Sequence, residues 1–340
     1  GSRAANGVVV VETKAPQPGK LRFTYNGNYK LEWPDLSVYN LLDAKGKLEL
    51  EELAGYYDDK DDVGLQHYYN RVKQEVLSGV NTYWISKPVQ TAFAHRHGLN
   101  IEGGDQALRY KIYLGANFAP GVMKKTDLNT KSGRVDIRYR FNKFLISNQL
   151  SLDYSKGSRT SPYGSFQEYA LINPYYRAYD ENGNIKKVLD DHRTSESGLD
   201  FVGYDSRPTM NPLYNTLFDS KDESRDFEVR EALQVEYTPM DNLRLSLDFT
   251  LSRKDGTVET FKPAQHTTFD QEKDPAKRGS YTWMKTEGYD YRLSLSGSYN
   301  KSLGDHLMSI YARYNVSESS SDMASLQMMG FPNDKLSEIY

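Results

Sequence analysis

The 340-residue sequence contains no cysteine, and this absence excludes a disulfide scaffold, a thiolate zinc site and a cysteine nucleophile. It also contains no apolar run near the roughly 20 residues that a membrane-spanning helix needs. The longest all-aliphatic stretch is only Val8 to Val11. Neither sign of charge is in large excess, because 43 Lys and Arg stand against 46 Asp and Glu, for a net charge of −3. We therefore expect no nucleic-acid partner, since such partners are held largely by phosphate neutralisation.

Tyrosine, by contrast, is abundant: 27 Tyr accompany 13 Phe and 3 Trp. Because a tyrosine ring has an apolar body and a polar tip, an excess of tyrosine suits surfaces that are half wet. Hydrophobic residues make up 38% of the chain and charged residues 26%, which fits neither an apolar-rich globule nor a disordered polyelectrolyte. A water-soluble helix bundle is disfavoured, whereas a single large β-barrel could use the whole length.

Apolar and polar residues alternate along many segments, which is the period of a strand with one dry and one wet face. The most regular segments are Leu243 to Ser252 and Tyr289 to Asn300. Further segments run over residues 21–29, 93–101, 108–118, 135–141, 144–154, 227–237 and 308–316. Two residues break the pattern: Asn148 interrupts one apolar face, and Glu231, on another, suggests a bulge. We predict nine strands.

The positions of the aromatic residues favour a membrane barrel over a soluble β-sandwich. In Tyr289–Tyr299 and Phe144–Tyr154 the middle of the apolar face is largely aliphatic and the ends are aromatic. A strand of roughly ten residues at ~3.3 Å per residue spans ~33 Å, which a tilt of about 40° projects to ~25 Å. This is the height of the apolar band of an outer-membrane barrel, which lies between two aromatic girdles.

Loop lengths alternate as well. The connections near residues 102–107, 141–143, 238–242 and 300–306 are short, and long loops are expected near 31–90, 119–132, 155–224, 255–288 and 319–340. Short periplasmic turns that alternate with long extracellular loops are typical of bacterial barrels. We predict an all-β chain that forms a partial antiparallel transmembrane β-barrel with long extracellular loops. Within these loops, Lys47–Tyr57 has helical spacing and Asn182-Gly183 favours a hairpin.

The sequence offers little for catalysis or metal binding. It has no nucleophile elbow, phosphate loop or glycine-rich dinucleotide motif. His95 and His97 would share a strand face, but no third ligand is near in sequence, and a structural or lumen-facing role is favoured. The acidic run Asp58–Asp62 departs from the calcium-loop pattern and is interpreted as a solvated loop. We predict no enzyme activity, no catalytic residue, no metal site and no cofactor.

Candidate substrate-binding residues form an aromatic cluster in one long loop: Tyr163, Phe166, Tyr169, Tyr175, Tyr176 and Tyr179. Aromatic faces stack on the C–H-rich faces of sugars, and tyrosine hydroxyls bond to sugar hydroxyls. The alternative for each residue is packing within a structured loop or against a protein partner. The predicted polar barrel face carries Arg134, Asp136, Arg138, Arg140, Arg244, Asp248, Arg292 and Arg313, which would bond to a plug, line a substrate path, or both.

The opening GSRAANGVVVVETK (1–14), followed by LRFTYNGNYK (21–30), resembles the plug end and first barrel strand of SusC/RagA-type TonB-dependent transporters. Further stretches fit that family in order: LLDAKGKLELEELAGYY (41–57), GVNTYWISKPVQ (79–90), RHGLNIEGGDQALRYKIYLG (96–115), GVMK (121–124), SPYGSF (161–166), INPYYR (172–177) and PLYN (212–215). Each motif is weak, and their number and order carry the resemblance. The chain departs from the pattern at Tyr83, where the family usually has Asp.

The resemblance implies about nine strands of a larger, roughly 22-stranded plugged barrel in the bacterial cell outer membrane. Residues 1–18 would be the C-terminal end of the plug domain, and residues 19–340 the N-terminal part of the barrel. The implied partners are TonB, contacted by a plug region that this fragment lacks, a SusD-like surface lipoprotein, outer-membrane lipid, and a glycan or peptide substrate. The implied function is TonB-dependent import of oligosaccharides or oligopeptides.

Two other interpretations stay open. A passive porin or surface adhesin would be a β-barrel without energy coupling, and the plug-like opening Gly1 to Lys14 disfavours it. A soluble β-sandwich that binds a ligand is disfavoured by the aromatic girdles and the loop asymmetry.

Overall fold

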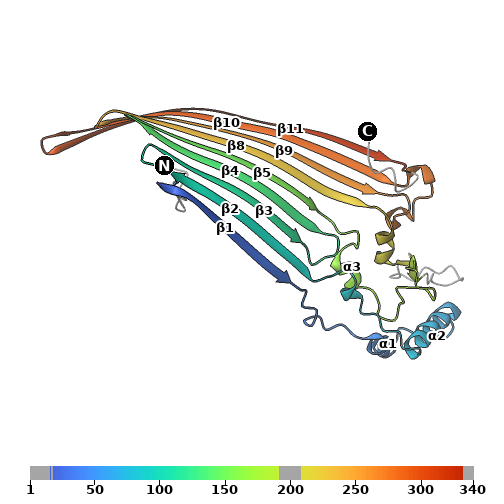
Figure 1. Cartoon of the computed structure of the whole chain (residues 1–340). Helices are drawn as coiled ribbons and strands as arrows, with labels where there is room; N and C mark the ends of the chain where they lie inside the picture. Colours follow the sequence, from blue (N-terminus) through green and yellow to red (C-terminus); the bar gives the residue numbers. More distant parts are fainter. Residues whose placement is uncertain (1–15, 17, 191–207, 332–340) are drawn as a thin grey trace.

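The computed structural model describes Pro16 and residues 18–190 and 208–331. Nine strands of this part form one antiparallel sheet in the order β1-β2-β3-β4-β5-β8-β9-β10-β11 (Figure 1). They are β1 (Gly19–Glu32), β2 (Ala92–Gly104), β3 (Leu108–Pro120), β4 (Asp127–Phe141), β5 (Phe144–Ser158), β8 (Lys221–Met240), β9 (Leu243–Lys262), β10 (Ser280–Leu303) and β11 (His306–Met329). The predicted all-β class and the nine strands are confirmed.

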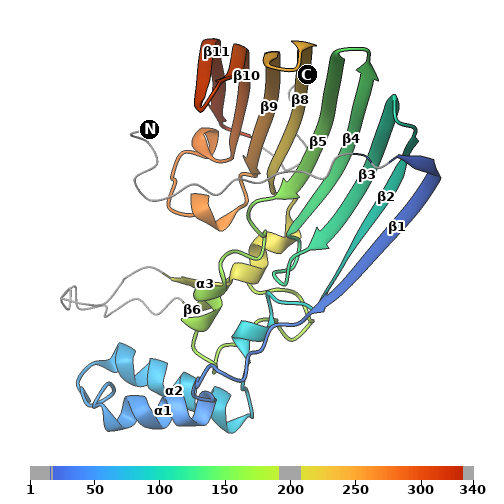
Figure 2. The same cartoon turned by 90° about the vertical axis from the view of Figure 1, so that its left-hand side faces the viewer.

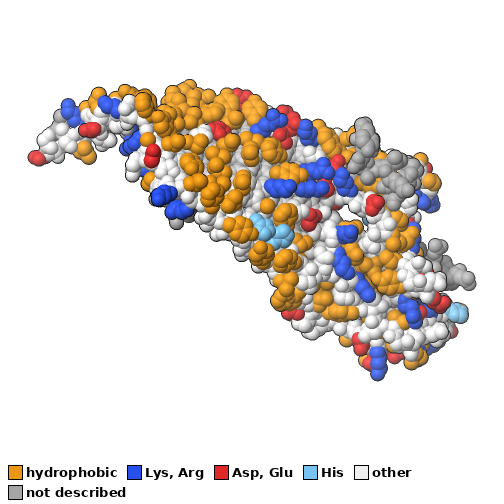
Figure 3. All heavy atoms as spheres, in the orientation of Figure 1, with side chains coloured by type: hydrophobic (Ala, Val, Ile, Leu, Met, Phe, Trp, Pro, Cys, Tyr) orange, Lys and Arg blue, Asp and Glu red, His pale blue; other side chains and the backbone are white. Residues whose placement is uncertain are grey.

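The strand register places the alternating residues of all nine strands on matching faces. One row across the sheet pairs Val235 with Leu247, Leu247 with Leu295, and Leu295 with Tyr314. The neighbouring row carries the small polar residues Ser246 and Ser296. Because the register is continuous, the two parities of each strand lie on opposite faces of the sheet, one with a broad apolar band and the other with mostly polar residues. Hydrophobic side chains gather over the strands on the face shown in Figure 3. We call these the apolar face and the polar face.

The bulge suggested at Glu231 is wrong. The pairing of β8 with β5 and β9 runs without a shift from residue 223 to residue 237, and the irregularity lies between Tyr237 and Met240, beside the turn. Glu231 stays on the apolar face because the Asn148 side chain on β5 donates a hydrogen bond to its carboxylate. The two residues that break the sequence pattern, Asn148 and Glu231, are therefore hydrogen-bonded to each other.

The strands of the C-terminal half are longer than the alternation alone indicates. β8 and β9 have 20 residues each, and β10 and β11 have 24 each. β9 continues to Lys262 and β10 begins at Ser280, so residues 263–279 connect them. Residues 121–126 likewise suffice to connect β3 to β4. The longer strands carry the sheet well past the apolar band on the side of the long loops.

Two long loops pack together beyond the strand ends and form a separate small body (Figures 1 and 2). We call it the loop module. It contains α1 (Ala44–Leu53), α2 (Val63–Leu77), η1 (Trp84–Ser86), α3 (Phe166–Ala170), β6 (Val188–Asp190), β7 (Thr209–Met210) and η2 (Pro212–Leu217). The loop between β9 and β10 adds η3 (Thr267–Phe269) and η4 (Pro275–Lys277). None of the helices among the described residues is long and apolar enough to cross a membrane.

Local sequence explains these short elements. Asp43 and Asp62 cap α1 and α2 by accepting hydrogen bonds from the N–H groups of Gly46 and Leu65. Ser165 opens α3 with a capping box. The helix expected over residues 47–57 therefore begins earlier, at Ala44, and ends at Leu53.

The hairpin expected at Asn182-Gly183 is present. Tyr179 pairs with Ile185, Gly183 adopts φ +84°, and the Asp180 carboxylate accepts hydrogen bonds from the Asn182 and Asn184 N–H groups. These hydrogen bonds, led by the one from the Asn184 backbone, lower the pKa of Asp180. A charged aspartate therefore holds the turn.

Candidate functional site: the polar face and the loop module

The predicted aromatic cluster lies in the loop module, and burial divides it. Tyr169, Tyr175 and Tyr176 are 0%, 1% and 9% exposed and belong to the module core. Tyr163 and Phe166 pack partly buried against that core. In this conformation the three buried rings have no face free for stacking with a ligand, as in the packing alternative. The assignment of the six residues to substrate binding stays a prediction.

Hydrogen bonds fix the buried tyrosines between the helices and the second loop. The Tyr176 hydroxyl lies 2.9 Å from the Tyr68 hydroxyl on α2 and donates to the Asp190 carboxylate at 2.8 Å. The Tyr175 hydroxyl donates to Glu51 on α1 at 3.1 Å. Burial raises the pKa of Tyr175 and of Tyr176, so both hydroxyls stay protonated and able to donate. Residues more than 100 positions apart thus form one core.

The remaining member, Tyr179, is 43% exposed at the edge of the module. The Lys87 ammonium lies 5.8 Å from the centre of its ring, and the Lys124 ammonium lies 5.4 Å from that of Tyr163. Both distances are within the range of cation–π contacts. Tyr163 and Tyr179 thus combine an aromatic surface with a nearby cation.

The predicted polar residues do lie on the polar face, where some are tied together. Arg134 donates to Asp136 at 3.2 Å, and Gln149 on β5 donates to the same carboxylate. A cavity of about 790 Å³ adjoins this group and also contacts Pro16 and Lys111. Pro16, three residues before β1, therefore lies beside the polar face.

Sequence reasoning missed Tyr113, which lies on the polar face at the centre of three adjoining cavities. In addition to the cavity at Pro16, Tyr113 lines two cavities nearer the long loops. Their volumes are about 440 Å³ and about 220 Å³. The local signal is Gly115, two residues after Tyr113 on the same face of β3, and the strand register then places Gly98 of β2 opposite it. Their missing side chains leave room for the tyrosine ring.

Of the two roles expected for His95 and His97, the lumen-facing one is wrong because both lie on the apolar face, and the structural one remains. The two side chains share one face, as expected, and their Nδ1 and Nε2 atoms are 3.0 Å apart. Tyr25 on β1 lies with its hydroxyl 2.6 Å from His97 Nδ1, and the His95 ring lies 4.9 Å from that of Phe118. The described residues contain no group of three or more His, Cys, Asp and Glu side chains that could hold a metal ion.

The acidic run is engaged in local structure. Asp59 accepts hydrogen bonds from the N–H groups of Asp61 and Asp62, and Asp62 in turn caps α2. These contacts form a turn that leads into a helix. They agree with the interpretation of the run as a solvated loop.

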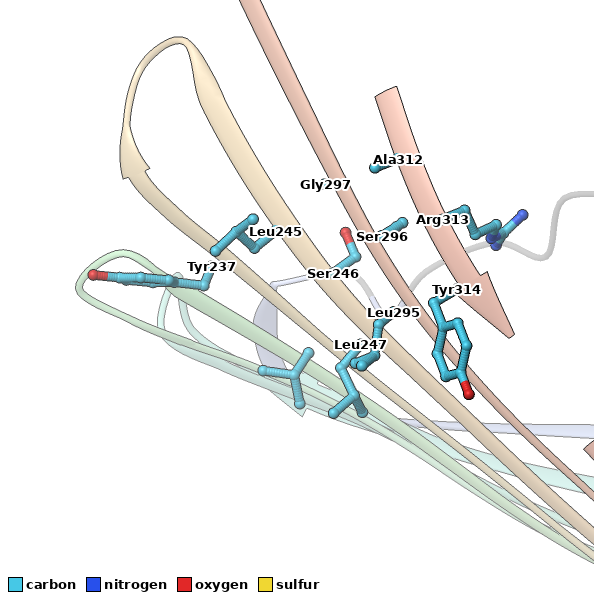
Figure 4. Close-up of a pocket in the computed structure, with 11 residues that line it drawn as sticks. Tyr237, Leu245, Ser246, Leu247, Leu295, Ser296, Gly297, Ala312, Arg313 and Tyr314 are labelled. Carbon is cyan, nitrogen blue, oxygen red and sulfur yellow. The ribbon is translucent and has the colours of Figure 1, made fainter. Parts of the chain in front are cut away.

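A shallow apolar groove of about 530 Å³ crosses strands β8 to β11 on the apolar face (Figure 4). Gly297 and Ala312 form its floor in register, and Leu245, Leu295 and Tyr314 flank them. Small residues between large ones explain the hollow. Its lining resembles the rest of the apolar face.

Comparison with known proteins agrees with the resemblance inferred from the motifs. No family model matches the chain. The sequence is 23% identical over 270 residues to the TonB-dependent receptor SusC of Bacteroides thetaiotaomicron, a match that covers 76% of this chain and 25% of SusC.

Solved structures give the same result for the fold. The RagAB peptide importer in its closed-closed state matches with a TM-score of 0.74 and 18% identity over 99% of this chain and 39% of that one. A second structure, of the RagAB peptide transporter, matches with a TM-score of 0.75 and 18% identity over 98% of this chain and 38% of that one. The SusC/RagA-type resemblance is confirmed, and the chain spans about a quarter of SusC. These relatives are described as receptor and transporter proteins, not as enzymes.

Proposed function

We propose that the chain is part of a TonB-dependent importer of the bacterial outer membrane, which takes up oligosaccharides or oligopeptides together with a SusD-like surface lipoprotein. In this proposal residues 1–18 end the plug domain, and residues 19–340 form the N-terminal part of the barrel. The apolar face meets lipid, and the polar face lines the plugged lumen. The long loops are extracellular, and the short turns are periplasmic.

The observation that carries the proposal is the continuous division of the sheet into two faces. Leu247 and Leu295, which face each other in register, are bordered by apolar residues on β8 and β11. A sheet with one apolar face exposed to this extent would aggregate in water, whereas hydrocarbon solvates it. The roughly ten-residue height of the apolar band supports a transmembrane position.

The contact of Pro16 with the polar face supports a plugged barrel rather than an open pore. Pro16 shares its cavity with Lys111, Asp136 and Arg138, all of which carry charged groups. Plug and wall would thus bond through polar groups. Polar contacts of this kind can be exchanged for water when a pull through TonB rearranges the plug, which would open a path for substrate.

The surface of the loop module supports contact with a protein lid. Trp33 and Val38 are 67% and 69% exposed, and Leu41 and Leu42 are 45% and 48% exposed. Large apolar side chains at such exposure, close in sequence, are typical of protein interaction sites. In the proposal this segment contacts the lipoprotein, and Tyr163, Phe166 and Tyr179 are the members of the aromatic cluster best placed to touch substrate.

The test is uptake by intact cells that produce the full-length transporter. Fluorescently labelled oligosaccharides and oligopeptides are supplied to wild-type cells, to cells without TonB, and to cells without the SusD-like lipoprotein. We expect accumulation to fall to background without TonB or after collapse of the proton-motive force. Equal accumulation of the labelled compounds in all strains would contradict the importer function and favour a passive porin.

A further inference from the structure

We propose that Tyr113 and the two glycines beneath it form a sugar-binding subsite on the polar face of the sheet. The proposal rests on the importer function and names one place where its substrate is held. The site lies on β2, β3 and β4, away from the aromatic cluster of the loop module (Figure 1).

The tyrosine ring lies flat on the sheet over a floor of glycine. A Cβ atom at Gly98 would lie 3.2 Å from Tyr113 Cε2, and one at Gly115 would lie 2.5 Å from the Tyr113 hydroxyl oxygen. The second distance is too short for any side chain, so Gly115 is required for this position of the ring. One face of the ring covers the glycines, which leaves the other face to the cavities.

The cavity on the turn side of the ring is lined in part by a residue that precedes β1. Pro16 contacts the cavity of about 790 Å³ that Tyr113, Lys111 and Asp136 share. Among the described residues, the lining of the cavity of about 220 Å³ on the loop side of the ring comes from β2, β3 and β4. Within the described residues, the loop side of Tyr113 therefore faces the direction from which substrate would enter.

The loop-side cavity has the chemistry of a saccharide site. Its polar side chains are Asn117, Thr130, Ser132 and Arg96, and the described part of the chain places no carboxylate in its lining. Hydroxyl and amide groups exchange hydrogen bonds with sugar hydroxyls in both directions. The tyrosine face supplies the apolar surface on which the C–H groups of a sugar ring stack. Arg96 adds donors at the edge that suit sugar oxygens.

Sheet stability alone would also explain an aromatic ring over glycine, and the structure provides a matched control for that role. Tyr110, on the same strand, lies over Gly103 on the apolar face, where a Cβ would be 3.1 Å from the Tyr110 hydroxyl oxygen. Both tyrosines shield a glycine. Of these two tyrosines, Tyr113 lines the polar cavities and Tyr110 does not.

The experiment uses the full-length transporter in detergent. Wild-type protein is screened on an array of neutral and uronic-acid oligosaccharides and on a peptide library, and hits are measured by calorimetry. We expect glycan binding, a loss of about tenfold in affinity for Tyr113→Ala, and a change of less than about threefold for Tyr113→Phe. Tyr110→Ala should bind as wild type does, with an unchanged heat-modifiable shift in gel migration as evidence of folding.

A second variant tests the position of the ring rather than its presence. Gly115→Ala keeps the tyrosine but displaces it, so its affinity should fall as in Tyr113→Ala, with no further loss in the double variant. A wild-type protein that binds only peptides, or no glycan on the array, would overturn the subsite. Unchanged glycan affinity in Tyr113→Ala would overturn it as well. Neither result bears on the importer function, which fails only if uptake is independent of TonB.

Discussion

The Asn148 side-chain amide donates a hydrogen bond to the Glu231 carboxylate from one strand to the next, in the middle of the apolar face. Asn148 lies four residues from Phe144 at the turn end of β5, and on β8 Glu231 lies between Leu233 and Val229 on the same face. A polar side chain in hydrocarbon is costly when it lacks a partner, and much less so when it has one. The pair is therefore a unit whose halves depend on each other.

The first prediction is that the two residues are energetically coupled. Asn148→Leu or Glu231→Leu alone leaves one unpaired polar group on the apolar face, and each should destabilise the folded full-length protein by about 1–3 kcal/mol. The double variant removes both groups and should lie within about 1 kcal/mol of wild type. Equilibrium unfolding of the full-length protein in lipid vesicles measures all four free energies of unfolding. Additive single effects would show that the hydrogen bond is not formed.

The second prediction concerns the medium that the apolar face meets. Leu247→Arg places a cation near the middle of the apolar band, and on a lipid-facing surface this should cost about 2–4 kcal/mol. The neighbouring Ser246→Arg puts the same side chain on the polar face of the same strand, where a much smaller effect is expected. The measurement is the fraction of full-length protein assembled in the outer membrane. Equal assembly of the two variants would argue against lipid contact.

The sequence predicts the fold well where the two faces of a strand meet different media. Leu243 to Leu251 alternates without exception because one face is apolar and the other polar, and the short turns place each strand beside the next one. The strand ends near the loops were not predicted. Residues 221–226 of β8 are all polar, and Lys221 and Arg225 there pair with Glu259 and Glu223. With water on both faces the period of two disappears, and backbone pairing alone extends the strand.

The candidate sites were harder to predict, since they depend on contacts between distant segments. Local sequence shows that Tyr175 and Tyr176 form an aromatic pair, but not that α2, over 100 residues earlier, encloses them. Tyr113 stands in an ordinary amphipathic strand. Its place over the glycines depends on Gly98, which belongs to a different strand and becomes a neighbour only through the register.

The third prediction tests the core of the loop module. Tyr176→Phe removes the hydroxyl that contacts both Tyr68 and Asp190, which leaves the Asp190 carboxylate, 7% exposed, with one donor fewer. We expect the module to lose about 1–3 kcal/mol of local stability, seen as faster hydrogen exchange across α2. Tyr179→Phe is the control, because its side chain is exposed. No change in the exchange of α2 in Tyr176→Phe would contradict the role of this hydroxyl.

The last prediction is a pH dependence of the loop between β9 and β10. Burial, with a contribution from nearby Lys262, lowers the pKa of His266 from 6.5 to about 4. The neutral ring caps η3, since its Nδ1 atom accepts a hydrogen bond from the Thr268 N–H at 3.1 Å. A protonated ring cannot accept this bond. The folded loop therefore favours the neutral histidine.

The sign of the effect follows from proton linkage. Between pH 6.5 and about pH 4 the unfolded loop binds a proton that the folded loop does not, so the stability contributed by His266 is present above this window and is lost as the pH falls through it. Hydrogen exchange at residues 267–270, corrected for the intrinsic rate, should show opening that increases from pH 7 to pH 4.5. His266→Asn keeps a capping acceptor without a titrating group, and should remove most of this increase. An equal increase in the variant would place the pH sensitivity elsewhere in the loop.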